Sequence, residues 1–213
     1  MSSQETYPNL PILQRAALAL ASASPRRREL LGRLVSASQF RIIAANINEE
    51  VRPDEEPAKY VQRLALEKAE AGAKLWATAS PAPEERLIIG ADTTVVLGEQ
   101  ILGKPTSPQE AVTMLEALSS QTHQVITGVA ALLLSDGQAV TRRESLTVVT
   151  QVEFRKLSRA EIDWYIATGE PMDKAGAYAI QGYGGAFIAA IHGDYYNVVG
   201  LPLASLIELL REF

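Results

Sequence analysis

The chain has 213 residues, 47% of them hydrophobic, which is enough to bury the core of one substantial domain or of one domain with two lobes. It contains no cysteine, and this excludes both disulfides and thiolate zinc sites. The net charge of -5 argues against nucleic-acid binding through a broad positive field, so an anionic ligand would need a local basic pocket.

The N-terminal segment shows no hydrophobic periodicity. Residues 1–16 contain Pro8 and Pro11, and we expect them to form a loose extension. The apolar run at 16–21 is short and no basic cluster precedes it, so we interpret it as a buried strand and not as a secretion signal. No apolar stretch approaches the roughly 20 residues that span a bilayer. We therefore expect residues 17–213 to form a single domain in the cytoplasm, without membrane association.

Strands and helices alternate along the first half of the chain. Ser24-Pro25 is an N-cap followed by proline at the first helical position, so a helix is expected to begin there. A second helix is predicted by apolar residues at helical spacing. These residues are Val61, Leu64, Ala65, Leu75 and Trp76. The elements expected in chain order are a strand at 18–21, a helix from 25 through 31, a strand at 40–43, an acidic loop at 48–57, a helix at about 58–79 and a strand, single or interrupted, at 87–97.

The second half combines a hairpin with further helices. Residues 107–110 and 158–161 have the pattern of capping boxes, and each is expected to start a helix. Ser135-Asp136-Gly137 is the expected turn between two strands. The elements expected are a helix from 107, strands at 124–134 and 139–154, a helix from 158 to about 169, a glycine-rich turn, a strand at 186–191, a tight turn at Gly193 and a helix after Pro202. This mixture predicts an α/β fold with a mixed central sheet and flanking helices.

The segment at residues 22–27, Ser-Ala-Ser-Pro-Arg-Arg, joins the first strand to the first helix. Backbone N–H groups and the positive end of the dipole at a helix start favour an anion. Arg26 and Arg27 add charge that the dipole disfavours there, a local conflict of the kind that marks functional sites. The segment is therefore a candidate phosphate site, while the alternative is that both arginines are solvated surface residues.

Asp92 interrupts the apolar run 87–97. A carboxylate in that position must be hydrogen-bonded, paired, bound to a metal or exposed in a cleft, because an uncompensated buried charge is costly. The alternative is an aspartate that caps a turn. We expect Asp92 to lie near Lys68 and the arginine-bearing helix.

Three further residues are candidates with looser context. Lys68 occupies an apolar stripe of the long helix, where it could either extend along the surface to solvent or reach an anion in a cleft. Lys104 lies between glycine and proline in a tight loop. Glu49, in the loop before the long helix, could join Asp92 around a hard cation, although a loop glutamate is usually solvated.

Several kinds of site are absent from the sequence. There is no GxxxxGK[ST] phosphate-binding loop. The only histidines, His123 and His192, are far apart and lack ligand spacing, so we interpret both as structural or surface residues.

Seven motifs occur in a fixed order after residue 17. They are Leu20-Ala21-Ser22-Ala23-Ser24-Pro25-Arg26-Arg27, Leu64-Ala65-Leu66-Glu67-Lys68-Ala69, Gly90-Ala91-Asp92-Thr93, Gly103-Lys104-Pro105, Met172-Asp173-Lys174-Ala175-Gly176-Ala177-Tyr178, Ile180-Gln181-Gly182 and Val199-Gly200-Leu201-Pro202. As an ordered set they resemble the Maf family, in the superfamily that includes inosine triphosphate pyrophosphatase. The resemblance implies one catalytic domain at 17–213 with two lobes around a nucleotide cleft.

The resemblance also implies an activity, the hydrolysis of a nucleoside triphosphate at its α-phosphate to the monophosphate and pyrophosphate. Asp92 would be the proton acceptor, and Mg²⁺ or Mn²⁺ would bridge Glu49, Asp92 and the triphosphate. The family often has two acidic residues where this chain has Asn48-Glu49, which makes Glu49 the better ligand candidate and leaves Glu50 as the alternative. The phosphate-binding residues implied are Ser22, Ser24, Arg26, Lys68 and Lys104.

Three positions imply the substrate. Arg27, Thr93 and Gln181 match the members that act on dTTP and UTP, whereas members that act on 7-methyl-GTP differ there. A glutamine amide offers a donor and an acceptor, which suits the edge of uracil or thymine. The alternatives are the removal of modified pyrimidine triphosphates and a non-catalytic, nucleotide-sensing role in the regulation of cell division. Family members are commonly dimers, so a homodimer is expected.

Overall fold

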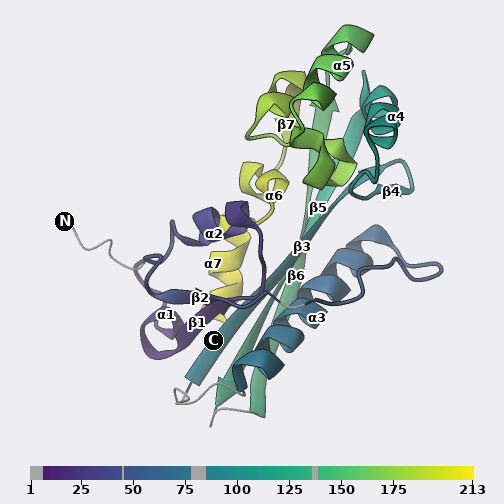
Figure 1. Ribbon diagram of the computed structural model, residues 1–213. Helices are drawn as coiled ribbons and strands as arrows, with labels where there is room; N and C mark the ends of the chain where they lie inside the picture. The colour runs from purple at the N-terminus through teal and green to yellow at the C-terminus, as the bar shows by residue number, and fades with distance from the viewer. Residues whose placement is uncertain (1–6, 45, 78–84, 136–138) are drawn as a thin grey trace. The chain divides into compact units, whose positions relative to one another are not determined.

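The computed structural model describes residues 7–44, 46–77, 85–135 and 139–213, and Figure 1 shows its elements. The strands are β1 (Ala17–Leu20), β2 (Phe40–Ile42), β3 (Glu85–Leu97), β4 (Gln100–Leu102), β5 (Thr122–Ser135), β6 (Ala139–Phe154) and β7 (Ile188–His192). The α-helices are α1 (Ile12–Arg15), α2 (Pro25–Leu31), α3 (Pro57–Ala77), α4 (Pro108–Leu118), α5 (Arg159–Ala167), α6 (Tyr195–Val199) and α7 (Leu203–Arg211). The 3-10 helices are η1 (Glu170–Asp173), η2 (Ala175–Ala177) and η3 (Tyr183–Phe187).

The strands form one mixed sheet in the order β2-β1-β3-β5-β6-β7, with β4 paired to β3 off this path. β1 is parallel to both β2 and β3, so that Leu18 lies opposite Phe40 on one side and Leu87 on the other. β4 is antiparallel to β3, and β7 is antiparallel to β6. Parallel neighbours need a crossover connection, which α2 provides between β1 and β2. The predicted α/β fold with a mixed sheet is confirmed.

The chain divides into two compact units. The first comprises Met1–Asp92, Thr127–Thr147 and Gly200–Phe213, and the second comprises Thr93–Ile126 and Val148–Val199. Strands β3, β5 and β6 contribute to both units, and with 13, 14 and 16 residues they are longer than most strands of globular proteins. That residues 17–213 act as a single domain stays a prediction.

Helix α3 supplies much of the core of the first unit. The buried residues on its inner face are Val61, Leu64, Ala65, Ala69, Ala73 and Trp76. The prediction for Leu75 is wrong, because its side chain is 52% exposed. Neighbouring residues of a helix point about 100° apart, so a helix that buries Trp76 turns Leu75 away from the sheet. In Figure 1, α3 lies along one side of the long strands and α7 along the other.

Two strand glycines allow α3 to approach the sheet closely. A Cβ atom at Gly90 of β3 would lie 2.1 Å from the carbonyl oxygen of Ala65 and 2.8 Å from the amide nitrogen of Ala69. A Cβ atom at Gly128 of β5 would lie 2.3 Å from the carbonyl oxygen of Val61. Glycine inside a strand often marks a place where another backbone comes close. These two glycines therefore set the separation between α3 and the sheet.

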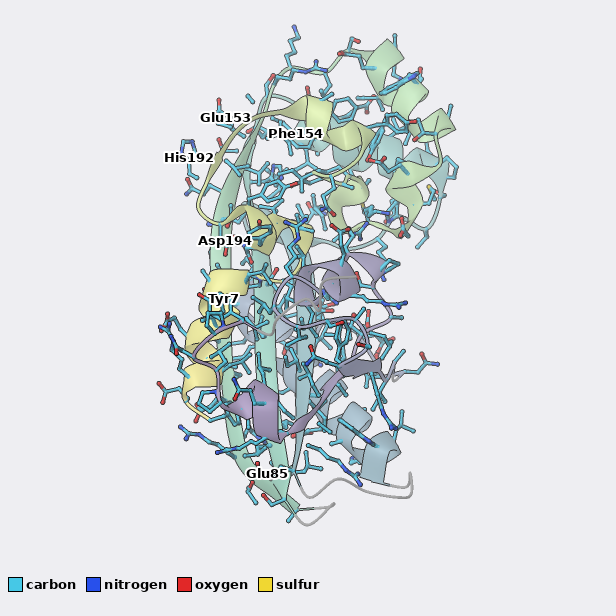
Figure 2. The ribbon with its side chains drawn as sticks, turned by 90° about the vertical axis from the view of Figure 1, so that its left-hand side faces the viewer. Tyr7, Glu85, Glu153, Phe154, His192 and Asp194 are labelled. Atoms are coloured by element: carbon cyan, nitrogen blue, oxygen red, sulfur yellow. The ribbon has the colours of Figure 1, made fainter. Side chains whose placement is uncertain are left out.

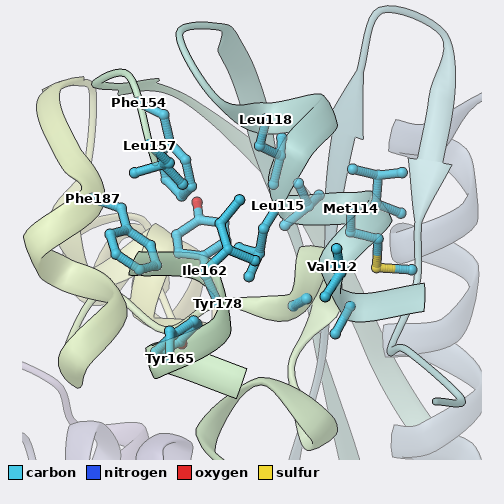
Figure 3. Packing of buried hydrophobic residues seen from close by; sticks show 14 of the residues in the cluster. Val112, Met114, Leu115, Leu118, Phe154, Leu157, Ile162, Tyr165, Tyr178 and Phe187 are labelled. Carbon is cyan, nitrogen blue, oxygen red and sulfur yellow. The ribbon is translucent and has the colours of Figure 1, made fainter. Parts of the chain in front are cut away.

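An aromatic core holds the second unit together (Figure 3). The ring of Phe154 contacts those of Tyr178 and Phe187 edge-on, with centroids 4.8 and 6.2 Å apart. His123 is 2% exposed, packs against the rings of Phe154 and Tyr178 and has its Nε2 atom 2.8 Å from the Tyr178 hydroxyl. His192 is exposed on the edge strand β7 (Figure 2). The interpretation of both histidines as structural or surface residues is confirmed.

The predicted capping boxes differ in outcome. At the start of α5, the Ser158 side chain accepts from the Glu161 amide while the Glu161 carboxylate accepts from the Ser158 amide, so this box is complete. At the start of α4, Ser107 accepts from the Glu110 amide, but the Glu110 carboxylate accepts instead from the Thr106 amide and hydroxyl. The Ser107 N-cap is therefore present, while the box predicted there is wrong.

Other departures concern short elements and the N-terminal segment. The expected loose extension is wrong for residues 10–16, because Leu10 and Ile12 are fully buried and α1 begins at Ile12. The turn at 135–137 and the end of the long helix at 79 lie largely outside the described residues. β4 and α6, which were not predicted, have only 3 and 5 residues and show too little periodicity to be recognised.

A helix can cross a bilayer only when it is both long enough and apolar enough. Within the ranges that the structure describes, no helix combines enough residues with enough apolar character to be a membrane span.

The close approach of α3 predicts that Gly90→Ala destabilises the fold. The added methyl group overlaps the helix backbone, so we expect the free energy of unfolding to fall by about 3 kcal/mol. Urea unfolding followed by tryptophan fluorescence measures this loss. Gly103→Ala is the matched control, because a Cβ atom there meets nothing within 4 Å, and it should change stability by less than about 0.5 kcal/mol. Equal losses in both variants would contradict the packing argument.

The burial of His123 predicts a pH dependence of stability. Burial lowers the pKa of His123 to about 4, whereas an unfolded histidine titrates near about 6.5. The stabilising effect of the neutral ring is complete above pH 6.5 and declines as the pH falls toward 4, because only the unfolded chain then binds the proton. Between pH 7.5 and 4.5, wild-type should therefore lose about 2–3 kcal/mol more stability than His123→Gln.

Denaturant unfolding at the two pH values checks this difference. His192→Gln is the control, because that exposed ring should leave the pH dependence of the wild-type protein intact. A His123→Gln protein with the full wild-type pH dependence would show that burial of this ring is not its source.

Candidate active site

Asp92 reaches Lys68 through the packing of β3 against α3. Side chains two residues apart on a strand share a face, so Asp92 points to the same side as Gly90, toward the helix. Asp92 is 8% exposed, and its Oδ1 atom lies 2.6 Å from Lys68 Nζ. The predicted proximity of Asp92 and Lys68 is confirmed, and the alternative of a turn-capping aspartate is wrong, because Asp92 lies inside β3.

Glu49 meets the same ammonium group. Its Oε1 atom lies 2.7 Å from Lys68 Nζ, so one lysine joins a loop carboxylate to a strand carboxylate. The Lys68 side chain is 12% exposed, which excludes an extended course into solvent. Two carboxylates and one ammonium leave a net negative charge among these three groups. The cluster therefore has the carboxylate oxygens that attract a further cation.

The loop that carries Glu49 is fixed to helix α3 by two side chains. The Tyr60 hydroxyl donates to the Glu49 carbonyl oxygen at 2.9 Å, and Arg63 Nη2 donates to the Glu50 carbonyl oxygen at 3.1 Å. Arg63 also forms a two-pronged ion pair with Glu55, with distances of 2.6 and 2.7 Å. Glu49 is thus held both by its backbone and by its carboxylate, in each case from α3.

The strand-to-helix turn at residues 22–27 forms a second hydrogen-bonded group. Ser24 is the N-cap of α2 and accepts from the Arg27 amide at 3.4 Å. Ser22 is 7% exposed, and its Oγ atom accepts from the Ser24 amide and from Arg27 Nη1, both at 3.2 Å. Arg27 Nε donates to the Gly200 carbonyl oxygen at 2.9 Å. These bonds fix the Arg27 side chain, so the alternative of a freely solvated arginine is wrong for this residue.

Charge links this turn to the carboxylates. Burial lowers the pKa of Arg27, the charge of Asp92 opposes that shift, and the neighbouring Arg26 adds to it. The pKa of Tyr60 is raised to about 12, first by burial and then by the negative charges of Asp92 and Glu49. The charges of Asp92 and Glu49 therefore act on the arginine-bearing helix, as expected. The arginine whose pKa the charge of Asp92 affects is Arg27.

The remaining predicted residues belong to the second compact unit. Thr93 directly follows Asp92 on β3 and is half-buried. Lys104 is exposed in the loop between β4 and α4. Gln181 is exposed in the turn before η3. Their solvent accessibility is compatible with ligand contact, and their roles stay predictions.

The donor set around Lys68 fits a hard divalent cation. Mg²⁺ is usually held by one or two carboxylates together with substrate phosphates and water. Glu49 and Asp92 provide two such carboxylates, both drawn to one positive group. Among the described residues there is no cluster of three or more histidine, cysteine, aspartate or glutamate side chains that would hold a metal ion without substrate.

Sequence reasoning missed Tyr60 and Arg63. Both lie on α3, three residues apart, and therefore on one face of the helix. The sequence offered one indication of such a role. Arg63 and Glu67 lie four residues apart on the helix that follows the acidic loop at 48–57. This indication could not be recognised without knowing that the loop folds back along the helix.

Comparisons with known proteins show what the whole chain is similar to. The family described as Maf-like protein matches residues 17–213. A protein of Photorhabdus laumondii named dTTP/UTP pyrophosphatase is 50% identical over 196 residues, covering 92% of this chain and 93% of its own. Proteins with the same name from Yersinia pestis and Hahella chejuensis are 52% and 47% identical and cover 92% and 93% of this chain, and 93% of their own length in each case. Because the match extends over nearly the whole chain, this protein belongs to the Maf-like family.

Proposed function

We propose that this protein hydrolyses dTTP and UTP to the nucleoside monophosphate and pyrophosphate. The observation that carries the proposal is the contact of Lys68 with Asp92 and Glu49, in a chain about half identical to proteins named dTTP/UTP pyrophosphatase. Such a cluster offers a base, a cation-binding carboxylate and a positive charge within a few ångströms. These are the groups that hydrolysis of a phosphoanhydride needs.

Asp92 is the proposed general base. Water forms a bond to the α-phosphorus, the bond from that phosphorus to the oxygen bridging to the β-phosphate breaks, and pyrophosphate leaves. The proton of the attacking water passes to the Asp92 carboxylate. Support comes from the position of Asp92 on the face of β3 that packs against α3, where it is held by Lys68 instead of by backbone groups.

Positive side chains neutralise the triphosphate and its leaving group in this proposal. Lys68, Arg26 and Lys104 supply the charge, and Ser22 and the backbone at Ser24 complete the phosphate site. Stabilisation of this kind depends on donors that are already in place. The hydrogen bonds of Ser22 with Ser24 and Arg27 support a turn that is ordered before substrate arrives.

Glu49 and Asp92 are the residues that would hold Mg²⁺ or Mn²⁺, with Glu50 as the alternative to Glu49. When bound, the cation would neutralise phosphate charge and polarise the reacting oxygens. Glu49 Oε1 points at the Lys68 ammonium, whereas the Glu50 carboxylate accepts from the Asn48 side-chain amide, and this difference favours Glu49.

Arg27, Thr93 and Gln181 are the proposed specificity residues. Arg27 is fixed by Ser22 and Gly200, which suits a residue that must present its guanidinium in one orientation. The homodimer expected from the family and the cytoplasmic location expected from the sequence stay predictions.

The first test is Asp92→Asn. Wild-type protein with UTP and Mg²⁺ should release UMP and pyrophosphate, and the variant should lose about 10²–10⁴-fold in kcat, because the amide cannot accept the proton. Enzyme-coupled detection of pyrophosphate measures the rate, and thermal unfolding shows that the variant folds. Asp163→Asn, which removes an exposed carboxylate paired with Arg159, is the control and should keep wild-type turnover.

Two outcomes would contradict this proposal. Turnover of Asp92→Asn at the wild-type rate would remove Asp92 from the chemistry. No release of UMP by the wild-type protein would favour a nucleotide-sensing role without catalysis.

The second test is Lys68→Met, which keeps the length of the side chain and removes its charge. We expect kcat to fall about 10²–10³-fold, because a fixed positive group is lost from beside the reacting phosphate. Steady-state rates with UTP check this, with Lys74→Met as control, since Lys74 is an exposed lysine of the same helix. A Lys68→Met enzyme within twofold of wild-type would reduce Lys68 to a structural partner of the carboxylates.

A further inference from the structure

The segment from Ala179 to Gly184 carries Gln181 and is hydrogen-bonded at both ends to one pair of side chains. We infer that Glu170, together with Tyr165, is a positioning residue that fixes this segment and thereby sets the selectivity for the pyrimidine base. The inference rests on the proposed function, in which Gln181 contacts the base. All of these residues belong to the second compact unit.

Tyr165 holds the beginning of the segment. Its ring is fully buried at the end of α5, and its hydroxyl accepts from the Ala179 amide at 3.3 Å. The same hydroxyl donates to Glu170 Oε1 at 2.8 Å. Because the ring is packed against Phe187, the hydroxyl is a fixed point and not a mobile partner.

Glu170 holds the end of the segment. Its Oε2 atom accepts from the Tyr183 amide at 2.9 Å, and its Oε1 atom accepts from the Gly184 amide at 3.1 Å. Together with the Tyr165 hydroxyl, the carboxylate accepts three hydrogen bonds. These bonds lower the pKa of Glu170 even though burial, the largest single effect, raises it. The charged form is therefore the one that the surrounding donors stabilise.

The glycines of the segment leave room for these anchors. A Cβ atom at Gly182 would lie 2.1 Å from Glu170 Oε2, and one at Gly184 would lie 2.7 Å from the Tyr165 hydroxyl oxygen. Neither glycine has a positive φ, so close packing against the two anchors, and not backbone conformation, accounts for the lack of a side chain. The chain thus carries glycine where the anchors need space and glutamine at the exposed position between them.

A fixed backbone matters because a glutamine amide can present either a donor or an acceptor. Uracil and cytosine differ by exchange of a donor and an acceptor on the edge that such an amide would contact. A mobile glutamine could turn to satisfy both bases, whereas one held in a single position would favour one of them. Glu170 and Tyr165 make no proposed contact with the reacting phosphate. Their loss should therefore act on base selectivity more than on kcat.

The test compares Glu170→Gln with wild-type protein on UTP and CTP. A carboxamide has one oxygen and one NH₂ group for three incoming donors, so at least one donor faces another donor. We expect the ratio of kcat/KM for UTP to that for CTP to fall about tenfold or more, mainly through a higher KM for UTP, while kcat for UTP stays within about threefold. Tyr165→Phe should change the same ratio in the same direction.

Glu161→Gln is the matched control. Glu161 also accepts hydrogen bonds from a backbone amide and a hydroxyl on helix α5, but it serves the capping box with Ser158 and touches none of the residues from Ala179 to Gly184. Its loss should lower stability without changing the ratio. An unchanged ratio in Glu170→Gln, or the same change in Glu161→Gln, would overturn the inference. If Glu170→Gln does not fold, Tyr165→Phe decides by the same ratio.

Hydrogen exchange without nucleotide separates this inference from the proposed function. Amides of residues 179–184 should exchange at least about tenfold faster in Glu170→Gln, and at the wild-type rate in Glu161→Gln. If Glu170→Gln exchanges faster but the wild-type protein does not hydrolyse UTP, the proposed function is wrong and the anchoring of residues 179–184 is supported. If the wild-type protein hydrolyses UTP but Glu170→Gln leaves both the exchange and the kcat/KM ratio unchanged, the proposed function is supported and the anchoring is wrong.

Discussion

The close approach of helix α3 to strand β3 is the contact on which the candidate active site depends. Gly90 lets the helix backbone reach the strand, and the strand's two-residue period then directs Asp92 toward the helix. Lys68, one residue before Ala69 in the contact, meets Asp92 at 2.6 Å. A side chain at Gly90 would increase the separation of helix and strand, and the same change would separate Asp92 from Lys68. The packing of α3 on β3 and the contact of Asp92 with Lys68 therefore depend on the same close approach.

Helix α3 also determines where the second carboxylate lies. Loops do not usually hold a catalytic group within a fraction of an ångström unless neighbouring side chains fix them. Here Tyr60 and Arg63 bind two successive carbonyl oxygens of the loop, and Lys68 binds the Glu49 carboxylate. A single rigid helix thus supplies the three groups that hold Glu49. The loop is therefore bound to the helix at both its backbone and its Glu49 carboxylate.

The second unit, like the first, contains a carboxylate that is held by hydrogen bonds from other segments of the chain. In the first unit, Asp92 and Glu49 bind the Lys68 ammonium group. In the second unit, the Glu170 carboxylate accepts from two backbone amides, and Gln181 is exposed. In the proposed function, Asp92 serves the chemistry, and Gln181, held in a segment of the second unit, serves base selectivity.

The sequence by itself determined the α/β class, most of the longer elements and the need of Asp92 for a partner, because hydrophobic periodicity, proline N-caps and a charge within an apolar run are local signals. Lys68, in one of the ordered motifs, and Glu49, in the loop before the long helix, were likewise candidates from the sequence. Only the tertiary structure showed that Lys68 contacts Asp92 and Glu49 instead of extending into solvent. It also showed that Tyr60 and Arg63 hold the loop and that Leu75 is exposed. It also replaced the loose N-terminal extension with a packed segment around Leu10 and Ile12. These outcomes depend on contacts between residues distant in the chain, and local periodicity carries no information about which distant backbone a side chain will meet.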